Sequence, residues 1–242
     1  MRAILIFLRS LFVSVCVYVG AMVLFPTVPV RFSAKAAAFI FAALMMWLPP
    51  SMSPARAETA LLALGDSLTA GYGVPQGQSY PDKLEAALRA KGHAVRVINA
   101  GVSGDTSAGG RARLGWVLGD NPDAMIVALG GNDALRGLPP SQMYENLDAI
   151  LKTLKEKGVA VLLAGMQAPP NLGPEYTHAF NDVYRRLVEK YDVVFYPFLL
   201  EGVAAEPALN QGDGIHPTGA GYDVLVANIL PSVEKLLSRV GG

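Results

Sequence analysis

Short apolar runs alternate with segments of helical periodicity along most of this chain, and that alternation limits the folds open to it. The five runs are Ala60–Leu64, Val95–Ile98, Met125–Leu129, Val159–Ala164 and Val193–Phe198. Each run has the length of a strand, and the segments between them repeat apolar residues at the spacing of a helix. Strands that alternate with helices form a parallel sheet covered on both faces. The sequence therefore predicts a three-layer α/β/α domain with five parallel strands.

The chain divides into two parts at about residue 57. All twenty acidic residues follow Ala57, whereas five of the twenty Lys and Arg residues precede it. Residues 58–242 therefore carry fifteen basic and twenty acidic residues, a net charge of −5. They contain no Lys/Arg cluster with interleaved aromatic residues, which argues against a nucleic-acid partner. Their length is sufficient for one core and short for two, so we expect a single domain over 58–242.

Residues 1–57 are predicted to be a leader. Arg31 and Lys35 precede the apolar run Ala36–Leu48, and residues 55–57 form an A-x-A cleavage pattern. This order is typical of a secretory signal peptide. It predicts an exported protein, periplasmic or secreted, that begins at Glu58 and is not an integral membrane protein.

Two features of the leader leave alternatives open. The leader could remain attached as a membrane anchor, although its second apolar run is short for a membrane span. The earlier stretch Leu11–Val30 is long enough to cross a bilayer, but that orientation opposes the positive-inside preference. A translation start near Val28 or Val30 would resolve the conflict.

The single cysteine, Cys16, lies in the leader, so residues 58–242 contain no thiol for a disulfide or a metal site.

Glycine-containing turns follow the first three apolar runs. Ligand sites in parallel α/β sheets lie beyond the carboxyl ends of the strands, where these turns are expected. Gly65-Asp66-Ser67 would expose a serine hydroxyl beside backbone N–H groups. Gly104 offers an uncovered N–H, and Asn132 offers a side-chain amide, to an oxyanion. In the alternative interpretation, the polar residues only cap helices and the glycines only permit tight turns.

Asp213 and His216 form a second pair of chemical interest. An imidazole can take the proton of a serine hydroxyl, and a nearby carboxylate can hold the imidazole in the working tautomer. The other histidines, His93 and His178, have no such companion and are expected at the surface. In the alternative interpretation, Asp213 caps a turn and His216 lies at the surface.

Together, these blocks resemble those of the SGNH hydrolase family, which centre on Ser, Gly, Asn and His. The matching blocks are GDSLTAGY at 65–72, SGDTS at 103–107, GGNDALRG at 130–137 and DGIHP at 213–217. The resemblance extends over about residues 58–238. It is closest to the branch of periplasmic multifunctional thioesterase/lysophospholipases and arylesterases.

The resemblance implies a flavodoxin-like sheet with strand order 2-1-3-4-5. It implies a catalytic triad of Ser67, Asp213 and His216, and an oxyanion hole from the N–H groups of Ser67 and Gly104 with the Asn132 amide. A mobile loop beside the acyl pocket would bind substrate, and its residues would be Leu135, Arg136, Gly137, Leu138 and Pro139. The segments Val74–Ser79 and Pro170–Thr177 depart from the family pattern, which leaves substrate preference open.

The implied activity is hydrolysis of carboxylic esters or thioesters through an acyl-enzyme on Ser67. Aryl esters, acyl thioesters and lysophospholipids are the candidate substrates. We expect a monomer with no cofactor, and no metal, because a Cys/His ligand cluster is missing from the sequence. The rivals are a carbohydrate O-acetylesterase and a non-catalytic binding module on the same fold. Apolar residues in Leu135–Pro139 and Met166–Leu172 favour acyl chains over sugars, and the presence of every key side chain argues against a non-catalytic module.

Overall fold

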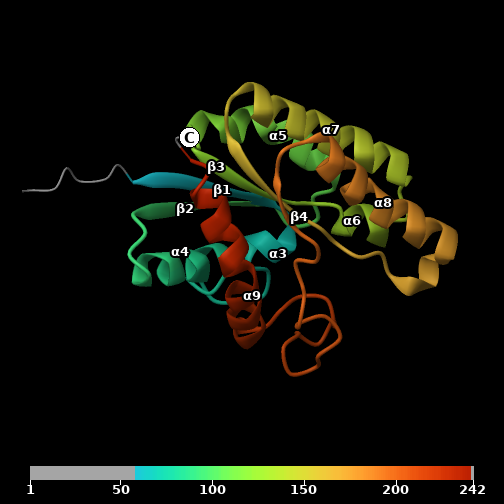
Figure 1. The fold of residues 1–242 in the computed structure, drawn as a ribbon. Helices are drawn as coiled ribbons and strands as arrows, with labels where there is room; N and C mark the ends of the chain where they lie inside the picture. Colours follow the sequence, from blue (N-terminus) through green and yellow to red (C-terminus); the bar gives the residue numbers. More distant parts are fainter. Residues whose placement is uncertain (1–57, 241–242) are drawn as a thin grey trace, which may run out of the picture. The chain divides into compact units, whose positions relative to one another are not determined.

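The computed structural model describes residues 58–240, and the predicted leader lies outside this range (Figure 1). Five parallel strands form one sheet in the order β2-β1-β3-β4-β5. The strands are β1 (Thr59–Gly65), β2 (Val95–Gly101), β3 (Ala124–Ala128), β4 (Ala160–Ala164) and β5 (Val194–Tyr196). The predicted fold class and strand order are confirmed, and the ends of the predicted strands shift by at most three residues.

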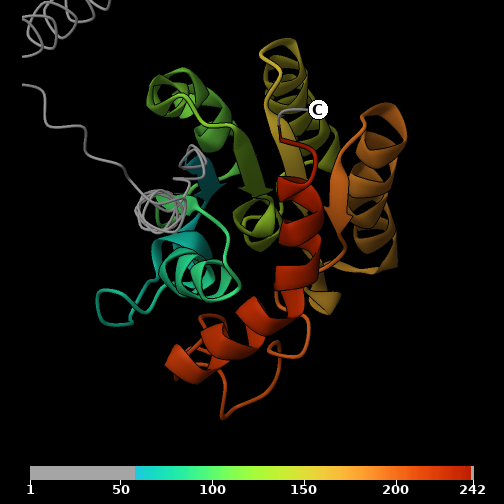
Figure 2. The same ribbon diagram turned by 60° about the vertical axis from the view of Figure 1, so that its left-hand side comes forward.

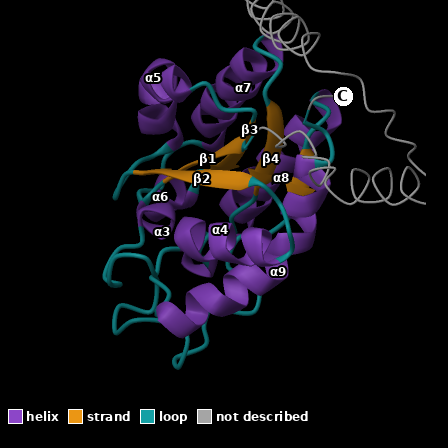
Figure 3. Cartoon of the chain, turned by 90° about the vertical axis from the view of Figure 1, so that its left-hand side faces the viewer, coloured by secondary structure: helices purple, strands orange, loops and turns teal. Residues whose placement is uncertain are grey.

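Helices cover both faces of the sheet. The helices are α3 (Ser67–Ala70), α4 (Tyr80–Ala90), α5 (Ser107–Val117), α6 (Gly131–Leu135), α7 (Pro140–Glu156), α8 (Pro174–Lys190) and α9 (Gly219–Leu237), with 3-10 turns η2 (Leu118–Asp120) and η3 (Pro170–Leu172). Helices α5, α7 and α8 lie in a row along one face (Figure 2). Helices α4 and α9 pack side by side on the other face (Figure 3). Across residues 58–240, no helix is long and apolar enough to cross a membrane.

The core follows from the hydrophobic pattern. Every residue of β3 is buried, as expected for a central parallel strand with helices on both faces. Helix α7 buries one stripe of apolar side chains at helical spacing and exposes its other faces. The stripe consists of Met143, Leu147, Ile150, Leu151 and Leu154.

Side-chain caps fix where several helices begin. Ser79 caps α4 in a capping box with Asp82, in which each side chain bonds the other residue's backbone N–H. Thr106 and Thr218 cap α5 and α9 through their hydroxyl groups. Because Thr106 and Thr218 lie between sheet and helix, their caps also define the length of the connecting loops.

The register of the parallel strands brings three loops to one edge of the sheet. Gly65 at the end of β1 pairs with Gly101 of β2 and with Ala128 of β3. The loops that follow these three strands therefore start side by side. They carry the residues for which the sequence predicts chemistry.

Candidate active site

Ser67 follows β1 and begins the one-turn helix α3. Its neighbour Asp66 caps this helix by accepting a hydrogen bond from the Leu68 backbone N–H at 3.0 Å. The turn has no room for a side chain at Gly65, where a Cβ atom would lie 2.9 Å from the carbonyl oxygen of Ala128. Glycine is therefore required where β1 meets α3, and the tight turn leaves Ser67 partly exposed at the edge of the sheet.

His216 and Asp213 lie between β5 and α9, far from Ser67 in the sequence. His216 Nε2 lies 2.8 Å from Ser67 Oγ, and His216 Nδ1 lies 2.6 Å from Asp213 Oδ2. A hydroxyl, an imidazole and a carboxylate in series can transfer a proton away from the hydroxyl as it attacks. The structure thus brings together the three residues of the expected triad.

Backbone hydrogen bonds orient the Asp213 carboxylate. Its Oδ1 accepts the backbone N–H groups of His216 and Ile215 at 3.0 and 2.9 Å, while Oδ2 faces the His216 ring. These bonds from His216 and Ile215 favour the ionised form and hold the pKa of the Asp213 carboxyl well below its usual value of 3.8. The carboxylate is therefore ionised at neutral pH and oriented before any substrate binds.

Two further residues, to which the sequence prediction gave no role, hold the histidine. The ring of Tyr72 packs against the His216 ring with 4.6 Å between centroids. Gln211 Nε2 donates to the carbonyl oxygens of Tyr72 and Pro217 at 2.8 and 2.9 Å. Tyr72 follows α3, so Gln211 ties the loop that carries His216 to the turn that carries Ser67.

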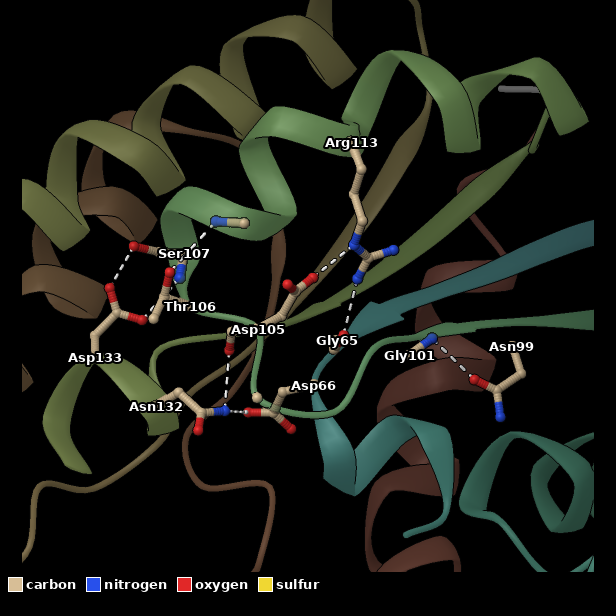
Figure 4. A network of polar contacts seen from close by, with 12 residues as sticks. Gly65, Asp66, Asn99, Gly101, Asp105, Thr106, Ser107, Arg113, Asn132 and Asp133 are labelled. Atoms are coloured by element: carbon tan, nitrogen blue, oxygen red, sulfur yellow. Dashed lines mark hydrogen bonds and ion pairs between the residues drawn. The ribbon is translucent and has the colours of Figure 1, made fainter. Parts of the chain in front are cut away.

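The expected oxyanion donors lie in the segments that follow β1, β2 and β3 at one edge of the sheet. Asn132 Nδ2 donates to the Asp105 carbonyl oxygen at 2.9 Å and to Asp66 Oδ2 at 3.2 Å (Figure 4). Gly104 has a φ of +83°, which glycine adopts without strain. Within residues 58–240, the backbone N–H groups of Ser67 and Gly104 donate to no other group. Two donors are therefore free, and Asn132 has one long hydrogen bond to exchange for a new acceptor.

Asp66 is a buried carboxylate beside these groups. Its exposed fraction is 4%, and burial raises the pKa of its carboxyl from 3.8 to about 6. The hydrogen bond from the Leu68 N–H, the nearby His216 and the Asn132 amide oppose this rise. Above pH 6, the folded protein therefore keeps a charge that is only partly compensated.

The buried charge of Asp66 predicts a pH-dependent gain in stability for Asp66→Asn. Because the folded pKa exceeds the unfolded one, wild type loses stability relative to this variant as pH rises from about 4 to about 6. The loss amounts to about 3 kcal/mol for a shift of about two units, and it is constant at higher pH. Asparagine remains a good helix cap at this position. Urea unfolding of both proteins between pH 4 and pH 8 measures the difference, and a pH-independent difference would contradict the prediction.

A cavity of about 370 Å³ opens beside Ser67 and His216. Its apolar lining comes mainly from the loops that follow β4 and β5. The apolar lining residues are Leu68, Leu135, Met166, Ala168, Pro169, Pro170, Phe198, Leu200, Ala204 and Ile215. A cavity of this size with apolar walls and a few polar groups at one end fits a small acyl compound.

The expected substrate loop, 135–139, contributes less to this cavity than the sequence implied. Of its five residues, only Leu135 lines the cavity. Arg136 instead donates to the Gly104 carbonyl oxygen at 2.6 Å, and the Leu138 carbonyl oxygen accepts from the Tyr176 hydroxyl at 2.8 Å. The segment after β4, which the sequence also linked to acyl chains, forms much more of the wall.

Two other features of the described residues are a cavity away from the site and the arrangement of side chains that could bind a metal ion. A cavity of about 470 Å³ lies at the amino ends of β4 and β5, at the opposite edge of the sheet from Ser67. Over the described range 58–240, no group of three or more His, Cys, Asp or Glu side chains is placed to hold a metal ion.

Comparison with known proteins agrees with this geometry. The sequence model of the GDSL-like lipase/acylhydrolase family matches residues 63–224, which include Ser67, Gly104, Asn132, Asp213 and His216. The chain belongs to the GDSL-like lipase/acylhydrolase family. It is a serine hydrolase, and the family resemblance predicted from the four sequence blocks is confirmed.

Individual members of the GDSL-like family are similar over most of the described residues. Esterase TesA of Pseudomonas aeruginosa is 42% identical over 182 residues, which cover 75% of this chain and 90% of that protein. Thioesterase 1/protease 1/lysophospholipase L1 of Escherichia coli K12 is 41% identical over 164 residues, 67% of this chain and 77% of that protein. The crystal structure of AlinE4, an SGNH-hydrolase family esterase, has a TM-score of 0.63 at 50% identity and covers 74% of this chain and 97% of its own.

Proposed function

We propose that this protein hydrolyses acyl esters and thioesters through an acyl-enzyme on Ser67, with His216 as general base and Asp213 as its orienting carboxylate. The observation that carries the proposal is the hydrogen-bonded series Asp213–His216–Ser67, which opens on an apolar cavity. Membership of the GDSL-like family supports the same reaction class.

In the first half of the reaction, His216 Nε2 takes the proton of the Ser67 hydroxyl as Oγ attacks the substrate carbonyl carbon. The carbonyl π electrons move to oxygen, and the N–H groups of Ser67, Gly104 and the Asn132 amide stabilise the resulting oxyanion. When the tetrahedral intermediate collapses, the bond to the leaving oxygen or sulfur breaks. The leaving group takes the proton from His216, and the acyl group remains on Ser67.

The second half repeats these steps with water. His216 takes a proton from the water as its oxygen attacks the acyl carbonyl carbon, and the oxyanion forms against the same donors. Collapse of this intermediate breaks the bond to Ser67 Oγ, which recovers its proton from His216. The carboxylic acid leaves, and no metal or cofactor takes part in either half.

The lining of the cavity supports an acyl chain as the part of the substrate that it holds. Its walls are mainly apolar, which suits an acyl chain better than the hydroxyl-rich surface of a sugar. The similar proteins named esterase TesA and thioesterase 1/protease 1/lysophospholipase L1 support ester and thioester leaving groups.

A substrate panel tests the proposal. Wild type and Ser67→Ala are compared on p-nitrophenyl esters, acyl-CoAs, lysophospholipids and acetylated sugars. We expect turnover of the first three classes by wild type alone, and a single phosphonate adduct at Ser67. Activity should survive chelators. Labelling at another serine, or preferential turnover of acetylated sugars, would overturn the assignment.

Asn132→Ala is expected to lower kcat by about 10²–10³-fold with little change in KM. The reason is that the amide would bond the oxyanion, which develops in the transition state and persists in the tetrahedral intermediate but is absent from the bound substrate, so substrate affinity is unaffected. Steady-state kinetics on one p-nitrophenyl ester measures the effect, and thermal unfolding checks that the variant is folded. A folded variant with a kcat near that of wild type would reduce Asn132 to a turn-forming residue.

Export is the second part of the proposal and is supported by the A-x-A pattern at residues 55–57. We propose that a signal peptidase cleaves the chain after Ala57 and that the mature protein acts outside the cytoplasm. Expression of the full chain in a Gram-negative host should yield a periplasmic protein whose intact mass corresponds to a start at Glu58. Retention of residues 1–57 in a membrane fraction would contradict this expectation.

A further inference from the structure

The side chain of Arg113 connects two of the loops that carry the expected oxyanion donors. Arg113 lies on α5, and 17% of its side chain is exposed. Its Nε donates to Asp105 Oδ2 at 2.6 Å, and its Nη2 donates to the carbonyl oxygen of Gly65 at 2.9 Å (Figure 4). The planar guanidinium thus holds an acceptor at the end of β1 and one in the loop after β2 in one fixed geometry.

Each acceptor lies within two residues of a residue of the proposed site. Gly65 ends β1, and Ser67 follows two residues later. Asp105 follows Gly104 directly, and its backbone carbonyl oxygen accepts the Asn132 amide at 2.9 Å. Through Gly65 and Asp105, Arg113 is therefore linked to the segments that carry Ser67, Gly104 and Asn132, although it contacts none of the expected reacting atoms.

A glycine in α5 provides the space for this arrangement. A Cβ atom at Gly109 would lie 2.4 Å from Asp105 Oδ1, so any larger residue would push the Asp105 carboxylate out of its place. Glycine inside a helix is unfavourable for helix stability, so its presence at this point has to be explained by the packing. By contrast, a Cβ atom at Gly115 on the same helix would meet nothing within 4 Å.

We propose that Arg113 is a positioning residue that fixes the Gly104 N–H and the Asn132 amide relative to Ser67. It acts through Asp105, whose carboxylate fits into the space that Gly109 leaves open. This inference rests on the proposed function, because it concerns the same oxyanion. Donors that stabilise an oxyanion must be in place before the charge develops. A displacement of about 1 Å at such a site costs about 10²-fold in rate.

Two pairs of variants test the proposal, each with its control on α5. In the first pair, Arg113→Lys keeps the charge beside Asp105, but its single ammonium cannot reproduce the fork that holds both acceptors. Its control is Arg111→Lys at an exposed position, where the arginine bonds the Asn146 side chain and no other group between residues 58 and 240. In the second pair, Gly109→Ala displaces Asp105 and leaves Arg113 intact, with Gly115→Ala as its control.

We expect Arg113→Lys to lower kcat by about 10²-fold with an unchanged KM. Gly109→Ala should act in the same direction, and both controls should retain wild-type kinetics. Affinity for an alkyl boronic acid, which forms a tetrahedral adduct with the nucleophilic serine, should fall in parallel with kcat/KM. An ion pair with a purely structural role would change the melting temperature and leave kcat/KM and the affinity for the boronic acid unchanged.

The inference is overturned if folded Arg113→Lys and Gly109→Ala have kcat values within about threefold of their controls, since that difference is far below the expected 10²-fold loss. It is also overturned if the loss appears in KM and the boronic acid still binds as tightly as to wild type. A wild-type protein that hydrolyses no substrate of the panel would instead defeat the proposed function, which distinguishes the two failures.

Discussion

Replacing either Ser67 or His216 with alanine should lower kcat by about 10⁶-fold, and the double replacement should lower it no further. The reason is that the hydroxyl and the imidazole, 2.8 Å apart, perform one step together. Without the base, the hydroxyl is not activated, and without the hydroxyl, the base has no nucleophile in reach. The residual rate comes from the oxyanion donors and from substrate binding, which neither replacement removes.

Single-turnover kinetics on a p-nitrophenyl ester measures these losses, after phosphonate treatment to inactivate traces of contaminating wild type. His178→Ala is the matched control, because His178 lies exposed on α8 with no contact to the cavity. Losses that add up in the double variant would contradict the shared step. They would mean that the two residues act in independent steps.

The parts of the fold that the sequence predicted well are those with local causes. The uninterrupted apolar run of β3 and the helical stripe of α7 depend only on neighbouring residues. The short helices α3 and α6 escaped prediction because a single turn is too short to show a helical period.

The residues of the candidate site could be predicted from strand ends and from short motifs, and Asp213 and His216 belong to the second group. Ser67, Gly104 and Asn132 were found because parallel strands bring their carboxyl ends to one edge. The cavity wall formed by Phe198, Leu200 and Ala204 was missed, because the long segment between β5 and α9 has no periodic pattern.

Long-range polar contacts were equally out of reach of sequence reasoning. Arg113 and Gly65 are separated by 48 positions, and nothing in either local sequence indicates their hydrogen bond. The burial of Asp66 depends on how α3 packs against its surroundings, and the local sequence Gly65-Asp66-Ser67 does not indicate that burial. The family resemblance implied that 135–139 lies beside the acyl pocket, but only Leu135, the last residue of α6, lines the cavity.

Asp213→Asn is expected to lower kcat by about 10⁴-fold, because it imposes the wrong tautomer on His216. In wild type, Asp213 Oδ1 accepts two backbone N–H groups, at 2.9 and 3.0 Å. These donors would select the side-chain oxygen of asparagine for the same place. The asparagine Nδ2 would then occupy the position of Oδ2, which faces His216 Nδ1 at 2.6 Å in wild type.

An N–H donor at that position forces Nδ1 to act as acceptor, so the ring proton moves to Nε2. Nε2 faces Ser67 Oγ and can then no longer take its proton.

Asp213→Ala provides the decisive comparison. It removes the carboxylate without supplying a donor, and water can accept the Nδ1 proton at this partly exposed position, where 39% of the Asp213 side chain is accessible. We therefore expect the alanine variant to retain more activity than the nearly isosteric asparagine variant. Thermal unfolding checks that both variants are folded. The opposite order would show that Asp213 acts through its charge and not through the tautomer of His216.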